Sequence, residues 1–102
     1  MKNAEIRAIA YELQELLNIP TRGVFKFKLA KLSKQFLDKA RIIEGSLEVD
    51  EKGVILNTQG NKEILELEDN FEFTKLTYRE LEPLEISTRT VLNLEKIIEE
   101  EL

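Results

Sequence analysis

The chain contains no cysteine, no histidine and no tryptophan among its 102 residues. Without cysteine there can be no disulfide bond, no thiol nucleophile and no thiolate metal ligand. Without histidine the commonest general base and the commonest metal ligand are both missing, so a Ser–His–Asp triad and the usual zinc sites are excluded. These absences predict a protein that is not an enzyme and that carries no cofactor.

Glycine and long apolar runs are also scarce. The four glycines stand singly, so the chain has neither a P-loop nor a dinucleotide-binding fingerprint. No apolar run approaches the roughly 18 residues that a membrane helix needs. The N-terminal stretch carries acidic residues and lacks the apolar core of a signal peptide. We therefore expect a cytoplasmic protein with no membrane partner and no small-molecule substrate.

The length and composition predict one domain spanning residues 1–102. Hydrophobic residues make up 42% of the chain and charged residues 34%, which is enough of each for a core and a solvated surface. The net charge is −5, but the two halves differ. Residues 1–45 hold nine Lys and Arg against five Asp and Glu, or +4, whereas residues 46–102 hold six against fifteen, or −9. The basic half can meet nucleic acid, or it can dock against the acidic half of its own or another subunit.

Apolar residues recur at helical spacing through most of the first half. Over residues 4–17 they fall at offsets of three and four, and Pro20 ends this helix because the residue before a proline avoids the α region. The turn 19–23 is short enough for a helical hairpin. A second helix is predicted over residues 24–43, with Gly45 as the left-handed residue that follows its end.

The periodicity changes after the second helix. Residues 46–50 alternate between polar and apolar, residues 54–56 are apolar and mostly β-branched, and residues 63–68 can form a third strand. A turn is predicted at Gly53, where glycine can adopt positive φ. These runs predict a short antiparallel meander, which is too small to stand alone and must lean on the helices.

The last third is harder to interpret, because residues 69–84 fit either a strand or a helix. Thr77 and Glu80 have the spacing of a capping box. Ser87 or Thr88 then caps a last helix that continues to the C-terminus. The predicted fold class is therefore α+β, with an N-terminal helical hairpin packed on a short antiparallel β-meander and a C-terminal helix.

Four short motifs follow one another along the chain. They are Leu17-Asn18-Ile19-Pro20-Thr21-Arg22-Gly23, Lys26-Phe27-Lys28-Leu29-Ala30-Lys31-Leu32, Asp50-Glu51-Lys52-Gly53 and Glu80-Leu81-Glu82-Pro83-Leu84-Glu85-Ile86. This order resembles that of a group of small phage and prophage proteins of unknown function, over about residues 10–98. The chain departs from the group after Gly45, where the second helix would be expected to run further. The resemblance implies a phage-encoded accessory or virion-assembly protein, inside the host cell or associated with the virion.

The second predicted helix carries the densest positive charge in the chain. Seven cations occur between residues 22 and 41, opposed only by Asp38. The candidate nucleic-acid surface consists of Arg22, Lys26, Lys28, Lys31, Lys34, Lys39 and Arg41. Such a density suits phosphate binding, but lysine is also a common residue on the solvent face of a helix. The sequence pI of about 4.9 is far from the basic value typical of nucleic-acid-binding domains.

Three apolar residues fall outside the predicted core faces. Phe27 and Leu37 lie off the buried stripe of the second helix, and Ile97 lies off that of the last helix. Apolar side chains left on a surface suit a protein partner or self-association. Phe27, Leu37 and Ile97 are therefore the candidate partner surface.

An acidic run was considered as a divalent-metal site, because Mg²⁺ and Ca²⁺ prefer oxygen ligands. Its members are Glu63, Glu66, Glu68, Asp69 and Glu72. Their spacing matches no calcium-binding loop, so we interpret them as a solvated face and expect no metal. The sequence as a whole predicts a non-enzymatic accessory or assembly protein acting through protein–protein contacts. The alternative is a small nucleic-acid-binding regulator that uses the basic second helix.

Overall fold

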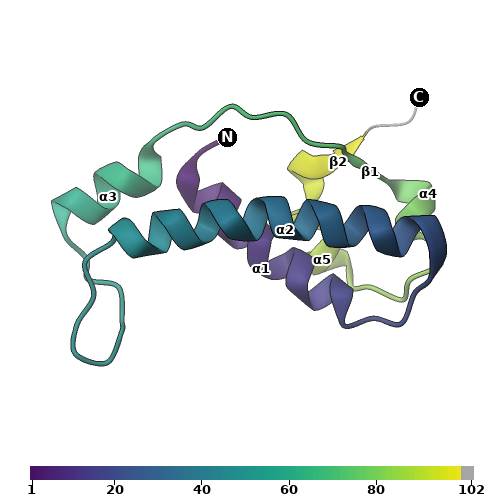
Figure 1. Cartoon of the computed structure of the whole chain (residues 1–102), viewed down its shortest axis with the longest axis horizontal. Coiled ribbons are helices and arrows are strands. Elements are labelled where there is room, and N and C mark those ends of the chain that lie inside the picture. Colours follow the sequence, from purple (N-terminus) through teal and green to yellow (C-terminus); the bar gives the residue numbers. More distant parts are fainter. Residues whose placement is uncertain (100–102) are drawn as a thin grey trace.

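The computed structural model describes residues 1–99 and is built mostly from helices (Figure 1). Its elements in order are α1 (Asn3–Leu17), α2 (Gly23–Ser46), α3 (Gln59–Glu66), β1 (Leu76–Thr77), α4 (Tyr78–Leu81), α5 (Thr88–Asn93), the 3₁₀ helix η1 (Glu95–Ile97) and β2 (Ile98–Glu99). The two strands form a parallel pair. The prediction of a mixed helix and strand fold is therefore confirmed at this coarse level.

The two long helices form the predicted hairpin. α1 and α2 lie side by side and are joined by a short turn (Figure 1). Each buries one apolar stripe at helical spacing, and the two stripes pack against each other. The buried residues of the stripes are Ile6, Ile9, Ala10, Leu13 and Leu16 on α1, and Leu29, Leu32, Phe36, Ala40 and Ile43 on α2.

The predicted end of the second helix is wrong by three residues. α2 continues through Gly45 to Ser46, and of the four glycines only Gly23 and Gly53 have positive φ. The apolar stripe explains the extension, because Leu47 lies four residues beyond Ile43 and is also buried, at 7% exposed. Gly45 is therefore an ordinary helical residue and not a left-handed cap.

The antiparallel meander is not present. Residues 47–57 form a protruding loop (Figure 1) in which Val49 and Ile55 make a single antiparallel bridge. Gly53 turns the loop with φ of 81°, as predicted. Residues expected to form a third strand lie largely in α3, which begins because the Thr58 side chain accepts a hydrogen bond from the Asn61 amide. A run of six residues is too short for its pattern of apolar residues to distinguish a strand from a helix.

In the C-terminal third, the predicted capping box is confirmed and the predicted long last helix is wrong. Thr77 and Glu80 form the predicted capping box at α4, and Ser87 caps α5. The predicted long last helix stops at Asn93, and the chain continues as η1 and β2. This change buries two consecutive side chains, those of Ile97 and Ile98, which one face of a helix could not easily do. The rest of that predicted helix, residues 100–102, lies outside the described residues.

A connecting segment, residues 67–75, runs from α3 to β1 over α2 (Figure 1). Its start is fixed by the N-terminus, where the backbones of Lys2 and Glu68 form an isolated antiparallel β-bridge. The Asn3 amide also donates to the Leu67 carbonyl at 2.9 Å. Its middle is fixed by Phe71 and Phe73, whose rings lie 5.2 and 5.3 Å from that of Phe36 in edge-on arrangements. The segment therefore closes the core over α2.

Buried apolar side chains from both halves of the chain form one cluster. It joins the hairpin to Leu76 of β1, to Leu81 of α4 and to the C-terminal residues 94–98. Among the described residues, no helix combines the length and the apolar character needed to cross a membrane.

Candidate functional site

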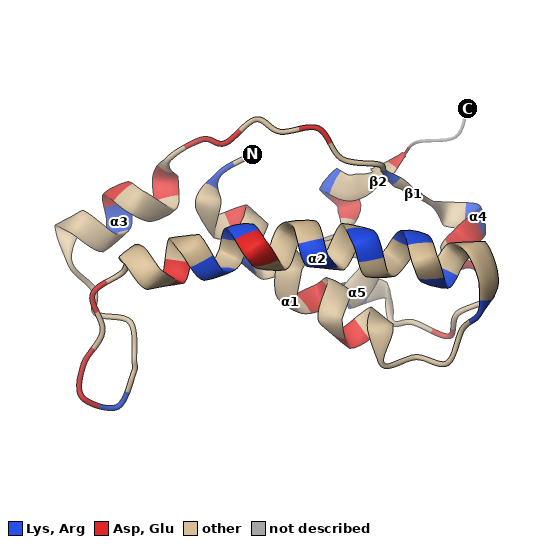
Figure 2. Cartoon of the chain, in the orientation of Figure 1, with Lys and Arg blue, Asp and Glu red and all other residues tan. Residues whose placement is uncertain are grey.

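The basic residues of the sequence prediction do gather on α2. Figure 2 shows Lys and Arg along much of this helix, with the connecting segment passing beside it. Lys31 and Lys34 are exposed and lie off the buried stripe that packs on α1, whereas Lys26 contacts the end of α1.

Three of the lysines already contact carboxylates of the same chain. Lys28 pairs with Glu80, Lys34 with Asp38 and Lys39 with Asp69, each with a nitrogen–oxygen distance of 2.8 Å. The Lys39 ammonium also lies 4.4 Å from the ring centroid of Phe71. Lys28 and Lys39 thus attach α4 and the connecting segment to α2, and much of the predicted basic surface serves the fold.

The other four cations have different surroundings. Lys26 donates to the Leu17 carbonyl at 3.0 Å and so closes the turn of the hairpin. Lys31 lies 5.5 Å from the ring centroid of Phe27. Arg22 and Arg41 are exposed. Within residues 1–99, Arg22, Lys31 and Arg41 have no carboxylate partner.

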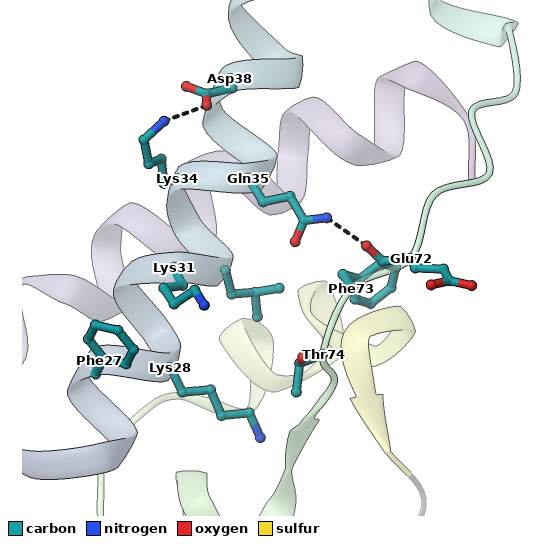
Figure 3. A pocket seen from close by; sticks show the side chains of 10 residues that line it. Phe27, Lys28, Lys31, Lys34, Gln35, Asp38, Glu72, Phe73 and Thr74 are labelled. Carbon is teal, nitrogen blue, oxygen red and sulfur yellow. Dashed lines mark hydrogen bonds and ion pairs between the residues drawn. The ribbon is translucent and has the colours of Figure 1, made fainter.

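An open groove of about 760 Å³ lies between α2 and the connecting segment (Figure 3). Its lining residues are Phe27, Lys28, Lys31, Leu32, Lys34, Gln35, Asp38, Glu72, Phe73 and Thr74. The Gln35 side chain spans the groove and donates to the Glu72 carbonyl at 2.6 Å. Lysines form one wall, and a stretch of extended backbone forms the other.

Glu80 has the most distinctive electrostatic surroundings near this groove. Burial raises the pKa of its carboxyl, but contacts with Lys28 and Thr77 outweigh that effect, so the pKa lies below its ordinary value of 4.5. The hydrogen bond from Lys34 likewise lowers the pKa of Asp38. The pKa of Glu44 is lowered chiefly by Tyr11, and that of Glu5 chiefly by Lys96. Each of these four carboxyls is therefore held in its charged form.

The predicted partner surface is only partly at the surface. Phe27 is 66% exposed at the edge of the groove, whereas Leu37 is half-buried. Ile97 is 0% exposed, so its assignment to a partner surface is wrong: the chain leaves the helical conformation there and turns this side chain into the core. Val24, which sequence reasoning did not select, is 87% exposed one turn before Phe27.

The acidic run does not converge on one point. Glu66 pairs with Lys2 at 2.7 Å, Glu68 with the N-terminal amine at 2.8 Å, and Asp69 with Lys39. In the described part of the chain, no three acidic side chains come together in a way that could hold a metal ion. The run is instead spread over α3 and the connecting segment.

Sequence reasoning missed the second wall of the groove. Glu72 and Thr74 lie far from Gln35 in the chain and meet α2 because the aromatic rings of the connecting segment pack on Phe36. The alternation of Phe71, Glu72 and Phe73 was the available signal, since it indicates an extended segment with one face buried. It does not indicate which helix the segment will cross.

Comparison of the chain with protein-family models, with curated proteins and with solved structures gave no match.

Proposed function

We propose that this chain is a non-enzymatic phage or prophage accessory or assembly protein that acts through protein–protein contacts, and that the outer face of α2 is its contact surface. The supporting observation is the exposure of Val24 and Phe27 at 87% and 66%, one turn apart on α2, with Phe27 also lining the groove. Aromatic side chains are enriched at protein interfaces. Covering this exposed ring with an apolar surface of a partner would remove apolar area from water, which favours binding.

The charges around the groove support a protein partner over nucleic acid. Lys28, Lys34 and Lys39 already contact carboxylates, so binding phosphate would first require breaking these pairs. A partner surface with both apolar and charged groups can leave the pairs in place. The net charge of −5 also opposes approach to a polyanion.

The titratable groups support a non-enzymatic role. General acid catalysis near neutral pH needs a carboxyl whose pKa is raised. The pKa values of Glu5, Asp38, Glu44 and Glu80 are shifted in the opposite direction. The lack of histidine and cysteine in the sequence supports the same conclusion.

The phage assignment rests on the motif order described above, and neighbouring genes test it. Genes for capsid, portal or tail proteins on either side would support a role in assembly. A neighbouring repressor or nuclease gene would favour the alternative of a nucleic-acid-binding regulator.

The contact surface is tested by purifying the chain from its native cells and measuring co-purifying proteins by quantitative mass spectrometry. The expected partner is a second copy of the chain or another protein. We expect it to be absent when the F27D variant is purified and present when the L92D variant is purified. Leu92 is the matched control because it is similarly exposed, at 62%, on α5. Equal recovery with both variants would contradict the proposal.

The nucleic-acid alternative has its own test. If α2 binds DNA or RNA, changing Lys28, Lys31 and Lys34 together to Glu abolishes an affinity that falls steeply with salt concentration. The proposed function predicts that no such salt-sensitive affinity exists in the unchanged protein. Fluorescence anisotropy with labelled DNA and RNA at two salt concentrations distinguishes the two functions.

A further inference from the structure

The outer face of α2 carries a continuous row of exposed side chains. Helical residues three and four positions apart share one face, and exposed residues follow this spacing along most of α2. The outer row consists of Val24, Phe27, Lys31, Lys34, Asp38, Ile42 and Gly45. It lies opposite the buried stripe of the same helix, and none of the described elements crosses in front of α2 in Figure 2. The described chain therefore leaves a second face of α2 uncovered.

The two ends of the outer row are apolar and its middle is charged. Phe27 is 66% exposed near the start of the row, and Ile42 is 72% exposed near its end. Between them, Lys31 has no carboxylate partner within residues 1–99, whereas Asp38 pairs with Lys34 at 2.8 Å. Asp38 is the only acidic residue among the exposed residues of α2. An order of apolar, positive, negative and apolar groups is its own complement when the helix direction is reversed.

A second copy of α2 laid antiparallel on the first brings these groups together in pairs. In an antiparallel pair of helices, the two residues that meet at each level have numbers with one constant sum. The pairs that share one sum are Phe27 with Ile42, Lys31 with Asp38, and Val24 with Gly45. No other part of the described chain lies within 4 Å of the side-chain position at Gly45, so Val24 has room there. A two-fold axis makes each contact occur twice, as in an isologous dimer.

Other pairings of two copies oppose like charges. Two parallel helices place Lys31, Lys34 and Asp38 each against the same residue of the second copy. An antiparallel pair shifted by four residues places Phe27 against Asp38 and Lys31 against Lys34. In the unshifted pair, Lys34 lies beside the two-fold axis, and its ion pair holds its ammonium towards Asp38, one turn away from that axis. The charges therefore select one direction and one register.

We infer that the partner of the outer row is a second copy of this chain, and that the two α2 helices pair antiparallel about a two-fold axis beside Lys34. Lys31 of each copy pairs with Asp38 of the other, and Phe27 of each copy packs on Ile42 of the other. The row extends over residues 24–45, about 33 Å along the helix, which is comparable with a short coiled coil. The inference rests on the proposed function, since it names the partner of the same surface.

Sedimentation velocity of the full chain at concentrations from about 1 to 500 μM tests whether the dimer forms. We expect the sedimenting mass to rise from that of one chain to that of two as the concentration increases. A single-chain mass throughout this range would overturn the inference. Assembly beyond two copies would also overturn it, because an isologous contact about one two-fold axis is closed.

Two charge reversals test the register. Lys31→Glu brings two carboxylates together in each cross-chain pair, and Asp38→Lys brings two ammonium groups together. We expect the dissociation constant of each variant alone to rise at least about tenfold. When K31E and D38K are mixed, each cross-chain pair again joins opposite charges, so we expect the mixture to form the dimer. The controls are Lys62→Glu and Glu85→Lys, which reverse exposed charges elsewhere and should change the dissociation constant less than about twofold.

The same sedimentation experiment measures these variants, after circular dichroism has shown that each keeps its helices. A dimer retained by K31E alone or by D38K alone would overturn the inference, and so would a mixture that stays monomeric. Equal weakening in the two controls would overturn it as well, because net charge and not the pairing would then govern association.

Cysteine cross-linking locates the two-fold axis without relying on the charge reversals. The chain has no cysteine, so a single introduced one reports only on its own position. In the antiparallel pair, residue 34 lies beside its counterpart, whereas residue 24 lies about 30 Å along the helix from its own counterpart. Under mild oxidation we expect K34C to form disulfide-linked dimers at least about tenfold faster than V24C, although Val24 is 87% exposed. Equal rates, or faster linking of V24C, would overturn the inference.

The outcomes separate this inference from the proposed function. If the chain stays monomeric while the native partner is still absent from purified F27D, the second-copy inference is wrong and the proposed function stands. If F27D and L92D retain the native partner equally, the proposed function is the part that fails.

Discussion

Asn61 shows how much one polar side chain contributes to this fold. It is 2% exposed, and its side chain makes three hydrogen bonds to the loop that precedes α3. The side-chain oxygen accepts from the Glu48 amide at 2.8 Å, and the side-chain nitrogen donates to the carbonyls of Glu48 and Leu56 at 2.9 and 2.7 Å. Asn61 therefore links both arms of the protruding loop to α3, in addition to the direct hydrogen bond from the Leu56 amide to the Glu48 carbonyl at 3.0 Å.

Replacing Asn61 by alanine is expected to lower the free energy of unfolding by about 2 kcal/mol, because three hydrogen bonds are lost at once. Urea denaturation at neutral pH measures the change. Asn57→Ala is the matched control, since Asn57 is exposed in the same loop and its substitution should change stability by less than about 0.5 kcal/mol. Similar losses in the two variants would contradict this role of Asn61.

Glu80 links acid stability to the attachment of α4. Its Oε1 atom accepts from Lys28 at 2.8 Å and from the Thr77 amide at 2.9 Å. Because its pKa is lower in the folded than in the unfolded chain, its contribution to stability is present above pH 4.5 and is lost as the pH falls through the folded-state pKa. The same direction applies to Asp38 and Glu44.

We therefore expect Glu80→Gln to be less stable than the unchanged chain at neutral pH, with a difference that shrinks towards about pH 3. Urea denaturation across this pH range provides the measurement. Glu85→Gln is the control, because Glu85 is exposed and its loss should leave the pH dependence unchanged. A difference between E80Q and the unchanged chain that stays constant with pH would contradict the linkage.

At the scale of elements, the long helices were predictable and the short elements were not. α1 and α2 contain enough turns for their apolar spacing to be unambiguous. α3 has only eight residues, and the strands β1 and β2 have two each, so these elements are too short for apolar spacing to identify them. Thr77 was identified correctly as a cap, and Ser87 is one of the two alternatives predicted for the last helix, because a cap depends on neighbours within one turn of the chain.

The connecting segment depends on its two phenylalanines for its position on α2. Phe73→Ala is expected to lower the free energy of unfolding by about 2 kcal/mol, less than for a fully buried phenylalanine, because Phe73 is half-buried. Amide exchange at Leu76 and Thr77 should accelerate in the same variant. Phe27→Ala is the control, and this exposed ring should change stability by less than about 0.5 kcal/mol. Unchanged exchange in F73A would show that other contacts hold the segment.

At the scale of the whole molecule, the sequence identified one wall of the groove and missed the other. The lysines of α2 and Phe27 were found because they share one helix. Glu72 and Thr74 join them only through long-range packing on Phe36, which no local pattern encodes. Ile97 was misplaced for a related reason: whether an apolar residue is inside or outside depends on where its helix ends.

The charge asymmetry between the two halves of the chain is partly resolved within the fold. Cations of the basic half pair with Glu66, Asp69 and Glu80 of the acidic half. The positive charge of α2 therefore contributes to tertiary structure. Of the cations without a carboxylate partner within residues 1–99, Arg22 and Lys31 lie towards the Phe27 end of α2 and Arg41 lies towards its other end. This distribution favours a protein contact on the outer face of α2 over binding of a polyanion along its length.

The most direct test of the central claim is to place a photo-activatable phenylalanine analogue at position 27 and irradiate the native cells. The same analogue at Leu92 is the control, because that side chain is exposed on α5 to a similar extent. We expect a protease-sensitive, nuclease-resistant adduct at position 27 and none at position 92. An adduct destroyed by nuclease, equal adducts at the two positions, or no adduct at position 27 would contradict it.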